Sequence, residues 1–165
     1  SGAHWMGARF GGCPVAPADT VTSATLTLNV DTTVRDSPDG AVIWGYDGAD
    51  CPAFTTTFGQ LSGLTKTTAS ETWSGTNIGA SDHDIDVTSI FNEIITNGLY
   101  TTGNAIGMFV DAGATTDLSI TGYDGSTTLC ARLTVVYTAA AGGQPTVARM
   151  RAVPGVGKAH GHQGW

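Results

Sequence analysis

A strict alternation of side-chain polarity at residues 21–30 constrains this chain most. The stretch VTSATLTLNV places Leu26 and Leu28 on one side of an extended backbone, and Thr25 and Thr27 on the other. Successive side chains of a β-strand point to opposite faces of its sheet, so the pattern predicts a strand with one buried and one exposed face.

Other segments along the chain have the same character. They are rich in β-branched and aromatic residues, and Gly- and Asp-rich turns such as SPDG and YDGS separate them. The further expected strands cover residues 4–12, 41–48, 69–76, 83–88, 105–111, 118–123 and 131–138. Short strands at regular spacing predict an all-β fold, a jelly-roll-like β-sandwich.

One segment follows a helical period instead. The apolar residues of DVTSIFNEIITNG are Val87, Ile90, Phe91, Ile94 and Ile95. This spacing predicts one short amphipathic helix at residues 88–97, lying over the end of the sheet pair. Asp86 or Thr88 is expected to cap its start, and Gly98 to end it.

The strand pattern ends at residue 138. The following AAAGGQP is typical of a flexible linker, so we predict a β-sandwich domain at residues 1–138 and a linker with an extended C-terminal arm at residues 139–165. The chain has a net charge of −7, yet this arm contains cationic residues and no acid. The contrast predicts that the arm binds neighbouring subunits rather than its own domain. The expected partner-binding residues are Arg149, Met150, Arg151, Val153, Val156, Lys158, His160, His162 and Trp165.

Several short motifs carry a resemblance to a known family. In chain order they are GARF, SATLTL, ETW, a DVT that opens the helix, GNAIG and a final LTVVY. They resemble the DNRLRE-type jelly-roll β-sandwich domains of phage virion and surface proteins, over residues 7–138. The resemblance implies roles in virion decoration, fibres, adhesins or carbohydrate-associated modules, and it carries over no catalytic residue. Such domains usually begin with further strands, which predicts a truncated N-terminus or a strand supplied by a neighbouring chain.

The sequence predicts no enzymatic reaction. It lacks a G-x-S-x-G motif, GVGKAHG lacks the spacing of a phosphate-binding loop, and no pattern pairs Glu71 with Glu93. The stretch SDHDID has carboxylates at alternate positions, which suit Ca²⁺, but the glycine and distal glutamate of an EF-hand are missing. It favours a solvated strand face with a helix cap. We therefore expect no catalytic residue, no metal and no cofactor.

Two residue types leave alternatives open. Trp5, Trp44 and Trp73 either form a sugar-stacking platform on one sheet face or serve in packing, and packing is the commoner use of aromatic residues in such folds. The three cysteines allow one disulfide and a free thiol, or a fully reduced set. A domain of this size does not need a disulfide framework, so we expect none; Cys13 and Cys130 are the first pair to check.

Two functions from different classes follow. The first is a non-enzymatic structural protein of a virion, such as a capsid cement, decoration or fibre-associated protein, which forms homo-oligomers and binds a major capsid or other virion protein. The alternative is a carbohydrate-binding module or adhesin with a glycan partner, extracellular or at a cell surface. The acidic body argues against direct nucleic-acid binding. No apolar run approaches the roughly 18 residues of a membrane span.

Overall fold

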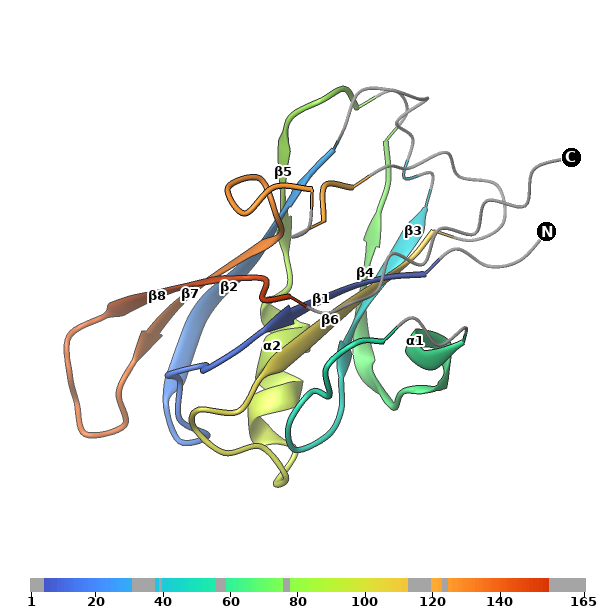
Figure 1. Ribbon diagram of the computed structural model, residues 1–165. Helices are drawn as coiled ribbons and strands as arrows, with labels where there is room; N and C mark the ends of the chain where they lie inside the picture. Colours follow the sequence, from blue (N-terminus) through green and yellow to red (C-terminus); the bar gives the residue numbers. More distant parts are fainter. Residues whose placement is uncertain are drawn as a thin grey trace, which may run out of the picture.

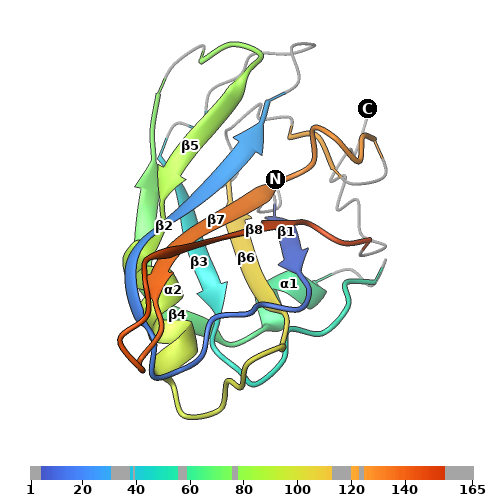
Figure 2. The same cartoon turned by 90° about the vertical axis from the view of Figure 1, so that its left-hand side faces the viewer.

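Two antiparallel four-stranded sheets pack face to face in the computed structural model (Figures 1 and 2). The structure describes residues 5–30, 38, 40–55, 59–75, 78–112, 120–122 and 125–154. The expected fold class, an all-β sandwich, is confirmed.

Strands that follow one another in the chain mostly lie in different sheets. The first sheet has the order β1 (Trp5–Phe10), β6 (Ile106–Asp111), β3 (Ala41–Tyr46) and β4 (Lys66–Trp73). The second has the order β5 (Asp82–Asp86), β2 (Thr20–Asn29), β7 (Arg132–Thr138) and β8 (Thr146–Arg151). The chain crosses between the sheets at each step from β1 to β3 and from β4 to β7, as a jelly-roll-like fold requires.

The core lies between the two sheets and follows the alternation seen in the sequence. Leu26 of β2 is buried on the inner face, and Thr25 beside it faces outward. Leu133 of β7 pairs with Leu26, while Ile43 and Met108 close the core from the other sheet. Apolar burial of this kind contributes roughly 25 cal/mol per Å² and is the main stabilising term of the sandwich.

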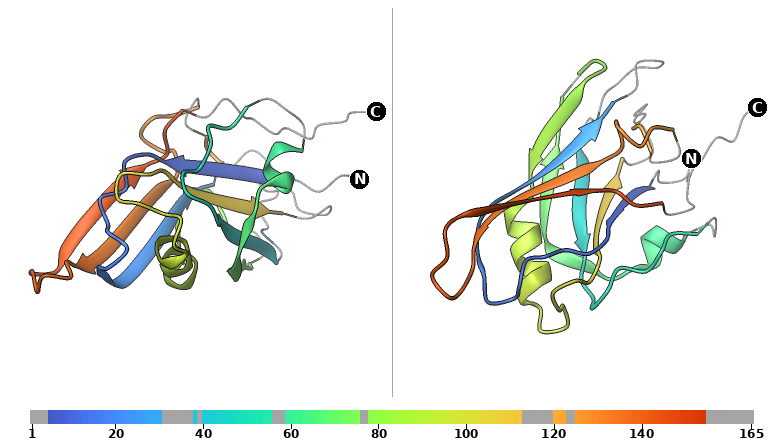
Figure 3. Two further views of the ribbon diagram at one scale, coloured as in Figure 1. Left: turned by 90° about the horizontal axis from the view of Figure 1, so that it is seen from below. Right: turned by 60° about the vertical axis from the view of Figure 1, so that its left-hand side comes forward.

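Helix α2 (Thr88–Thr96) lies between the sheets at one end of the sandwich, where Figure 3 (left) shows it end-on. Its start agrees with the expected helix at residues 88–97. The apolar stripe predicted from the sequence is buried, with Ile90, Phe91, Ile94 and Ile95 against β2, β3 and β4. The helix thereby closes an end of the core that the strands leave open.

A second helix, α1 (Gln60–Gly63), is a single turn that the sequence analysis did not predict. The segment between β3 and β4 carries it across the outer face of the first sheet. There a small second core forms from Cys51, Phe54, Leu61, Ala105 and Phe109. A single turn is too short to show the helical spacing of apolar residues, so no pattern in the sequence predicts α1.

The predicted end of the domain at residue 138 is wrong. Strand β8 pairs with β7 along its whole length, and Met150 is buried in the main core. The sequence analysis missed this strand because it is flanked by Pro145, Pro154 and several glycines, which are typical of loops. The residues of β8 nevertheless alternate between the core and solvent. Of the expected strand at residues 118–123, the described part forms a single bridge between Val30 and Ile120. In the described ranges, no helix is long and apolar enough to cross a bilayer.

Candidate functional site

The outer surface of the sheet β5-β2-β7-β8 separates charge from one edge to the other, and we call it the charged face. The outward side chains of β5 are Asp82, Asp84 and Asp86, and those of β8 are Val147, Arg149 and Arg151. Between them, in the rows of Asp84 and Asp86, lie Thr27 and Thr25 of β2 and Arg132 and Thr134 of β7. Because β5 and β8 are the two outer strands of this sheet (Figure 2), one edge of the face is acidic and the opposite edge is basic.

Strand register aligns these charges in rows across the sheet. Asp84 pairs with Thr27, which pairs with Arg132, which pairs with Arg151. The next row runs from Asp86 through β2 and β7 to Arg149. Each of these two rows therefore begins with a carboxylate and ends with a guanidinium.

The carboxylates of β5 make separate local contacts. Asp82 accepts a hydrogen bond from Asn29 at 3.0 Å and forms an ion pair with Arg132. The Asn29 amide, followed by the Arg132 guanidinium, lowers the pKa of Asp82 below its ordinary value. Asp84 accepts a hydrogen bond from the hydroxyl of Thr27 at 2.6 Å. Arg132 is thus engaged inside the sheet, and Arg151 donates to the Thr127 carbonyl at 2.8 Å, whereas Arg149 extends outward from the basic edge.

Asp86 lies beside the start of α2, but the expected cap by Asp86 or Thr88 is wrong, because the N-cap residue is Val87 and no side chain caps the helix there. The Asp86 carboxylate accepts hydrogen bonds from the Thr88 hydroxyl at 2.6 Å and from the Thr88 amide at 2.9 Å. These two bonds, the hydroxyl first, lower the pKa of Asp86. Among the described residues, no group of three metal-ligating side chains gathers. The stretch SDHDID therefore provides an outer strand of the sheet, and its last carboxylate binds Thr88 at the first residue of α2.

The expected partner-binding arm is divided by the structure. Met150 is only 7% exposed and belongs to the core, so its expected role in an apolar pocket of a neighbour is wrong. Val153 lies against its own domain, because its amide donates to the Arg9 carbonyl at 2.8 Å. Arg149 and Arg151 are exposed on β8, as a partner-binding role requires. The other expected partner residues lie outside the described residues: Val156, Lys158, His160, His162 and Trp165.

A second candidate site lies on the outer face of the other sheet. The indole rings of Trp5 on β1 and Trp44 on β3 stack with a centroid distance of 5.8 Å and an interplanar angle of 20°. The Lys66 ammonium lies 4.4 Å from the Trp5 ring centroid and 5.5 Å from that of Trp44. All three side chains are partly exposed. We call this group the tryptophan–lysine cluster.

The cluster contains two of the three tryptophans considered for a sugar platform. Trp73 is only 7% exposed and lies in the main core, with its ring 6.0 Å from that of His83. Its role is packing. Trp5 and Trp44 lie on the outer face of the first sheet because each is an outward residue of its strand. Lys66 lies on the same outer face, because it pairs with Tyr46 two residues after Trp44 on β3. The sequence analysis missed Lys66, since pairing of β3 with β4 is needed to bring it there.

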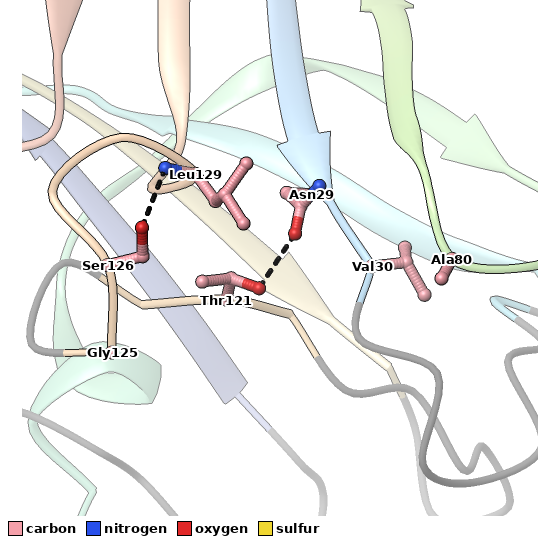
Figure 4. A pocket seen from close by; sticks show the side chains of 7 residues that line it. All are labelled: Asn29, Val30, Ala80, Thr121, Gly125, Ser126 and Leu129. Atoms are coloured by element: carbon pink, nitrogen blue, oxygen red, sulfur yellow. Dashed lines mark hydrogen bonds between the residues drawn. The ribbon is translucent and has the colours of Figure 1, made fainter.

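A shallow, open pocket of about 380 Å³ lies beyond the end of β2 (Figure 4). Its lining residues are Asn29, Val30, Ala80, Thr121, Gly125, Ser126 and Leu129. The polar side chains are already used in local hydrogen bonds: Thr121 donates to Asn29 at 2.8 Å, and Ser126 accepts from the Leu129 amide at 3.0 Å. The pocket offers little polar recognition beyond these contacts.

Three thiols and one phenol are buried, and the phenol joins two distant segments of the chain. Cys13, Cys51 and Cys130 are free and buried. Burial raises the pKa of Cys51 to about 12 and raises that of Cys13 as well. The Tyr100 hydroxyl lies 3.2 Å from the Cys13 carbonyl and 2.9 Å from the Val15 carbonyl, and burial raises its pKa too. Neutral, buried thiols of this kind are poor nucleophiles at ordinary pH.

The two glutamates serve α2 rather than a paired-carboxylate site. Glu93 accepts hydrogen bonds from the amides of Thr68 at 2.6 Å and Ala69 at 2.7 Å on β4. Glu71 accepts a longer contact of 3.4 Å from Ser89. Both carboxylates therefore join α2 to β4.

The chain was compared with protein-family models, with curated proteins and with solved structures, and none of the three comparisons gives a match.

Proposed function

We propose that this protein is a non-enzymatic structural component of a large assembly of repeated subunits, such as a decoration, cement or fibre-associated protein of a phage virion. One observation carries the proposal: the charged face has acidic side chains on one outer strand of its sheet, β5, and basic side chains on the other, β8. A surface of this kind is complementary to itself, so identical copies attract one another when one copy's basic edge meets another's acidic edge.

The resemblance to DNRLRE-type domains supports the same class of protein. The sequence analysis expected a free C-terminal arm to bind the neighbouring subunit, and in this proposal β8 takes that role. Its cationic side chains point outward, and its apolar side chains hold it in the domain. Anchoring the basic residues on a strand restricts their motion before binding, which reduces the entropy lost when a partner is bound.

Sedimentation of the full chain over a range of concentrations tests this function. We expect oligomers whose average mass rises with concentration and falls as salt is added, since salt screens exposed charges over about 8–10 Å at physiological strength. A chain that remains monomeric at every concentration and at low salt would contradict the proposal.

The tryptophan–lysine cluster favours a second candidate function, the binding of a glycan. Partly exposed indole rings offer flat apolar surfaces for the C–H face of a sugar, and the Lys66 ammonium at 4.4 Å from Trp5 suits an acidic substituent beside it. The expected ligand is a saccharide that carries a carboxylate.

Binding of neutral and acidic oligosaccharides, followed through tryptophan fluorescence, tests this second function. Trp44→Ala is expected to abolish binding, and Lys66→Met is expected to weaken binding of the acidic sugars alone. Trp73→Phe is the matched control, because Trp73 lies in the core away from this cluster. Equal responses of wild type and Trp44→Ala would exclude the cluster as a glycan site.

A further inference from the structure

Among the four outer strands of the two sheets, β5 is the one whose outer edge stays open in the described part of the chain. The edges of β1 and β8 meet each other, because Ala152 bridges Phe10 and the Val153 amide donates to the Arg9 carbonyl. On β4, the carboxylate of Glu93 occupies two neighbouring amides. An edge strand with unused backbone N–H and C=O groups can pair with a further strand.

The hydrogen bonds of β5 reveal which of its backbone groups face this open edge. The Val87 amide donates to the Ala24 carbonyl, and the register of β5 with β2 has no shift, so the odd-numbered residues bond to β2. Directions alternate along an antiparallel strand. The residues that turn their N–H and C=O groups outward are therefore Asp82, Asp84 and Asp86.

The same three residues place exposed carboxylates on the charged face at every second position. The Thr27 hydroxyl binds Oδ1 of Asp84, and both Thr88 donors bind Oδ1 of Asp86. In the described part of the chain, Oδ2 of Asp84 and Oδ2 of Asp86 accept no hydrogen bond. A strand laid along β5 would thus find unused backbone groups and negative charge at the same positions.

The chain itself contains a segment with the complementary pattern. Residues 155–165 read GVGKAHGHQGW and contain neither an acid nor a proline. Side chains two residues apart lie on one face of an extended backbone. Lys158, His160 and His162 would therefore share one face of a strand, and only Ala159 and Gly161 would separate them on the other.

We propose that residues 158–162 of one copy pair with β5 of a second copy as an added antiparallel strand. The inference rests on the proposed assembly function and names the contact made at the acidic edge. The cationic residues and the carboxylates then lie opposite each other in three pairs: Lys158 with Asp86, His160 with Asp84, and His162 with Asp82. Opposite charges directly across an antiparallel pair stabilise it.

The reach of the segment makes the partner a second copy. Pro154 is the last described residue, and it follows Val153, which is bonded to β1. A strand added outside β5 lies four strand spacings from β8, a distance of about 19 Å. The four residues that lead from Pro154 to Lys158 span at most about 14 Å. In this register the segment cannot reach the β5 edge of its own copy.

The contact extends the attraction between the charged edges of two copies. Strand β8 ends next to the segment, so a basic edge that approaches an acidic edge also brings residues 158–162 toward β5. Gly155 and Gly157 allow the chain to turn away from its own sandwich before the pairing begins. Because the contact joins different surfaces of identical chains, it repeats from copy to copy and produces a closed ring or an open filament.

Proline at neighbouring positions of the segment tests the backbone contact. His160→Pro removes an amide that the pairing with β5 uses, whereas Ala159→Pro removes an amide that faces away from β5. We expect His160→Pro to raise the dissociation constant of the oligomer by about tenfold or more, and Ala159→Pro to raise it by less than about threefold. Sedimentation measures both constants, and far-UV circular dichroism checks that both variants keep the β-sandwich.

The register and the exchange between copies are tested by mixing charge variants. His160→Asp and Asp84→Lys should each weaken assembly, because each places like charges opposite one another. An equimolar mixture should recover assembly, since the two variants then meet through an intact pair or a reversed pair. A mixture of His162→Asp with Asp84→Lys should recover less, because residue 162 lies opposite Asp82 in this register.

The outcomes separate this inference from the function on which it rests. A larger loss in His160→Pro than in Ala159→Pro, with recovery in the matched mixture, would support the pairing. Normal assembly of His160→Pro, equal effects of the two prolines, or no recovery in the matched mixture would overturn the pairing and leave the structural function in place. A monomeric wild-type chain would overturn both.

Discussion

Met150 of β8 lies directly opposite Leu133 of β7, and both side chains are buried in the core between the sheets. This pairing makes residues beyond the predicted linker part of the fold. It also gives β8 two different faces, since Met150 faces inward and Arg149 faces outward.

Removal of β8 is therefore expected to destabilise the domain. A chain that ends at Ala141 should melt at a lower temperature than the full chain, because it exposes β7 and part of the core. Met150→Ala should lower the free energy of unfolding by about 2–5 kcal/mol. Arg149→Ala, its exposed neighbour, should change it by no more than about 0.5 kcal/mol. An unchanged melting temperature in the shortened chain would contradict the packing of β8.

Glu93→Ala should weaken the attachment of α2 to β4. It leaves the amides of Thr68 and Ala69 without their carboxylate acceptor, and such a loss costs about 1–3 kcal/mol. Urea denaturation measures the change. Glu71→Ala serves as the control, since Glu71 makes only a 3.4 Å contact with Ser89 and should matter little. Equal effects of the two substitutions would show that Glu93 is not a specific link.

The sequence was sufficient for features that depend on local periodicity. Alternation at residues 21–30 predicted β2, and the spacing of Ile90, Phe91 and Ile94 predicted α2 with its buried face. The same approach failed for β8. Prolines and glycines around it outweighed an alternation in which only Ala148 and Met150 mark the inner face.

The candidate sites depend on pairing between distant segments, which a single sequence does not reveal. Arg151 and Asp84 are far apart in the chain, and only two intervening strands place them in one row. Lys66 reaches the rings of Trp5 and Trp44 for the same reason. The acidic stretch SDHDID and the cationic tail were both visible in the sequence, but their positions on opposite edges of one sheet were not.

Stability is expected to fall at alkaline pH. The pKa of Cys51 is raised from 9.0 to about 12, so between these values the unfolded chain releases the proton and the folded chain keeps it. Stability is then fully present below pH 9.0 and falls as the pH rises toward about 12. Cys13 and Tyr100, whose pKa values are also raised, act in the same direction.

Denaturation curves at increasing pH check this expectation. Cys51→Ala should show a shallower fall than wild type above pH 9.0, whatever its stability at neutral pH. The comparison uses slopes because the substitution also removes packing in the second core. An identical slope in both proteins would show that the Cys51 thiol does not carry the effect.

Gly45→Ala should destabilise the domain because α2 lies directly against Gly45. A methyl group at this position would lie 2.5 Å from Ile94 Cδ1 and 2.8 Å from Ile90 Cγ2. Both side chains are fixed in the core, so we expect a loss of about 1–3 kcal/mol in the free energy of unfolding. Gly63→Ala is the matched control; no atom lies within 4 Å of its added methyl group, and it should be neutral or slightly stabilising.

Ile94→Val removes Cδ1 and alone costs about 0.5–1.5 kcal/mol. In combination with Gly45→Ala it should relieve the overlap, so the double variant should lose less than the sum of the single losses. Chemical denaturation of the four proteins measures this coupling, and strictly additive losses would show that α2 does not rest on Gly45.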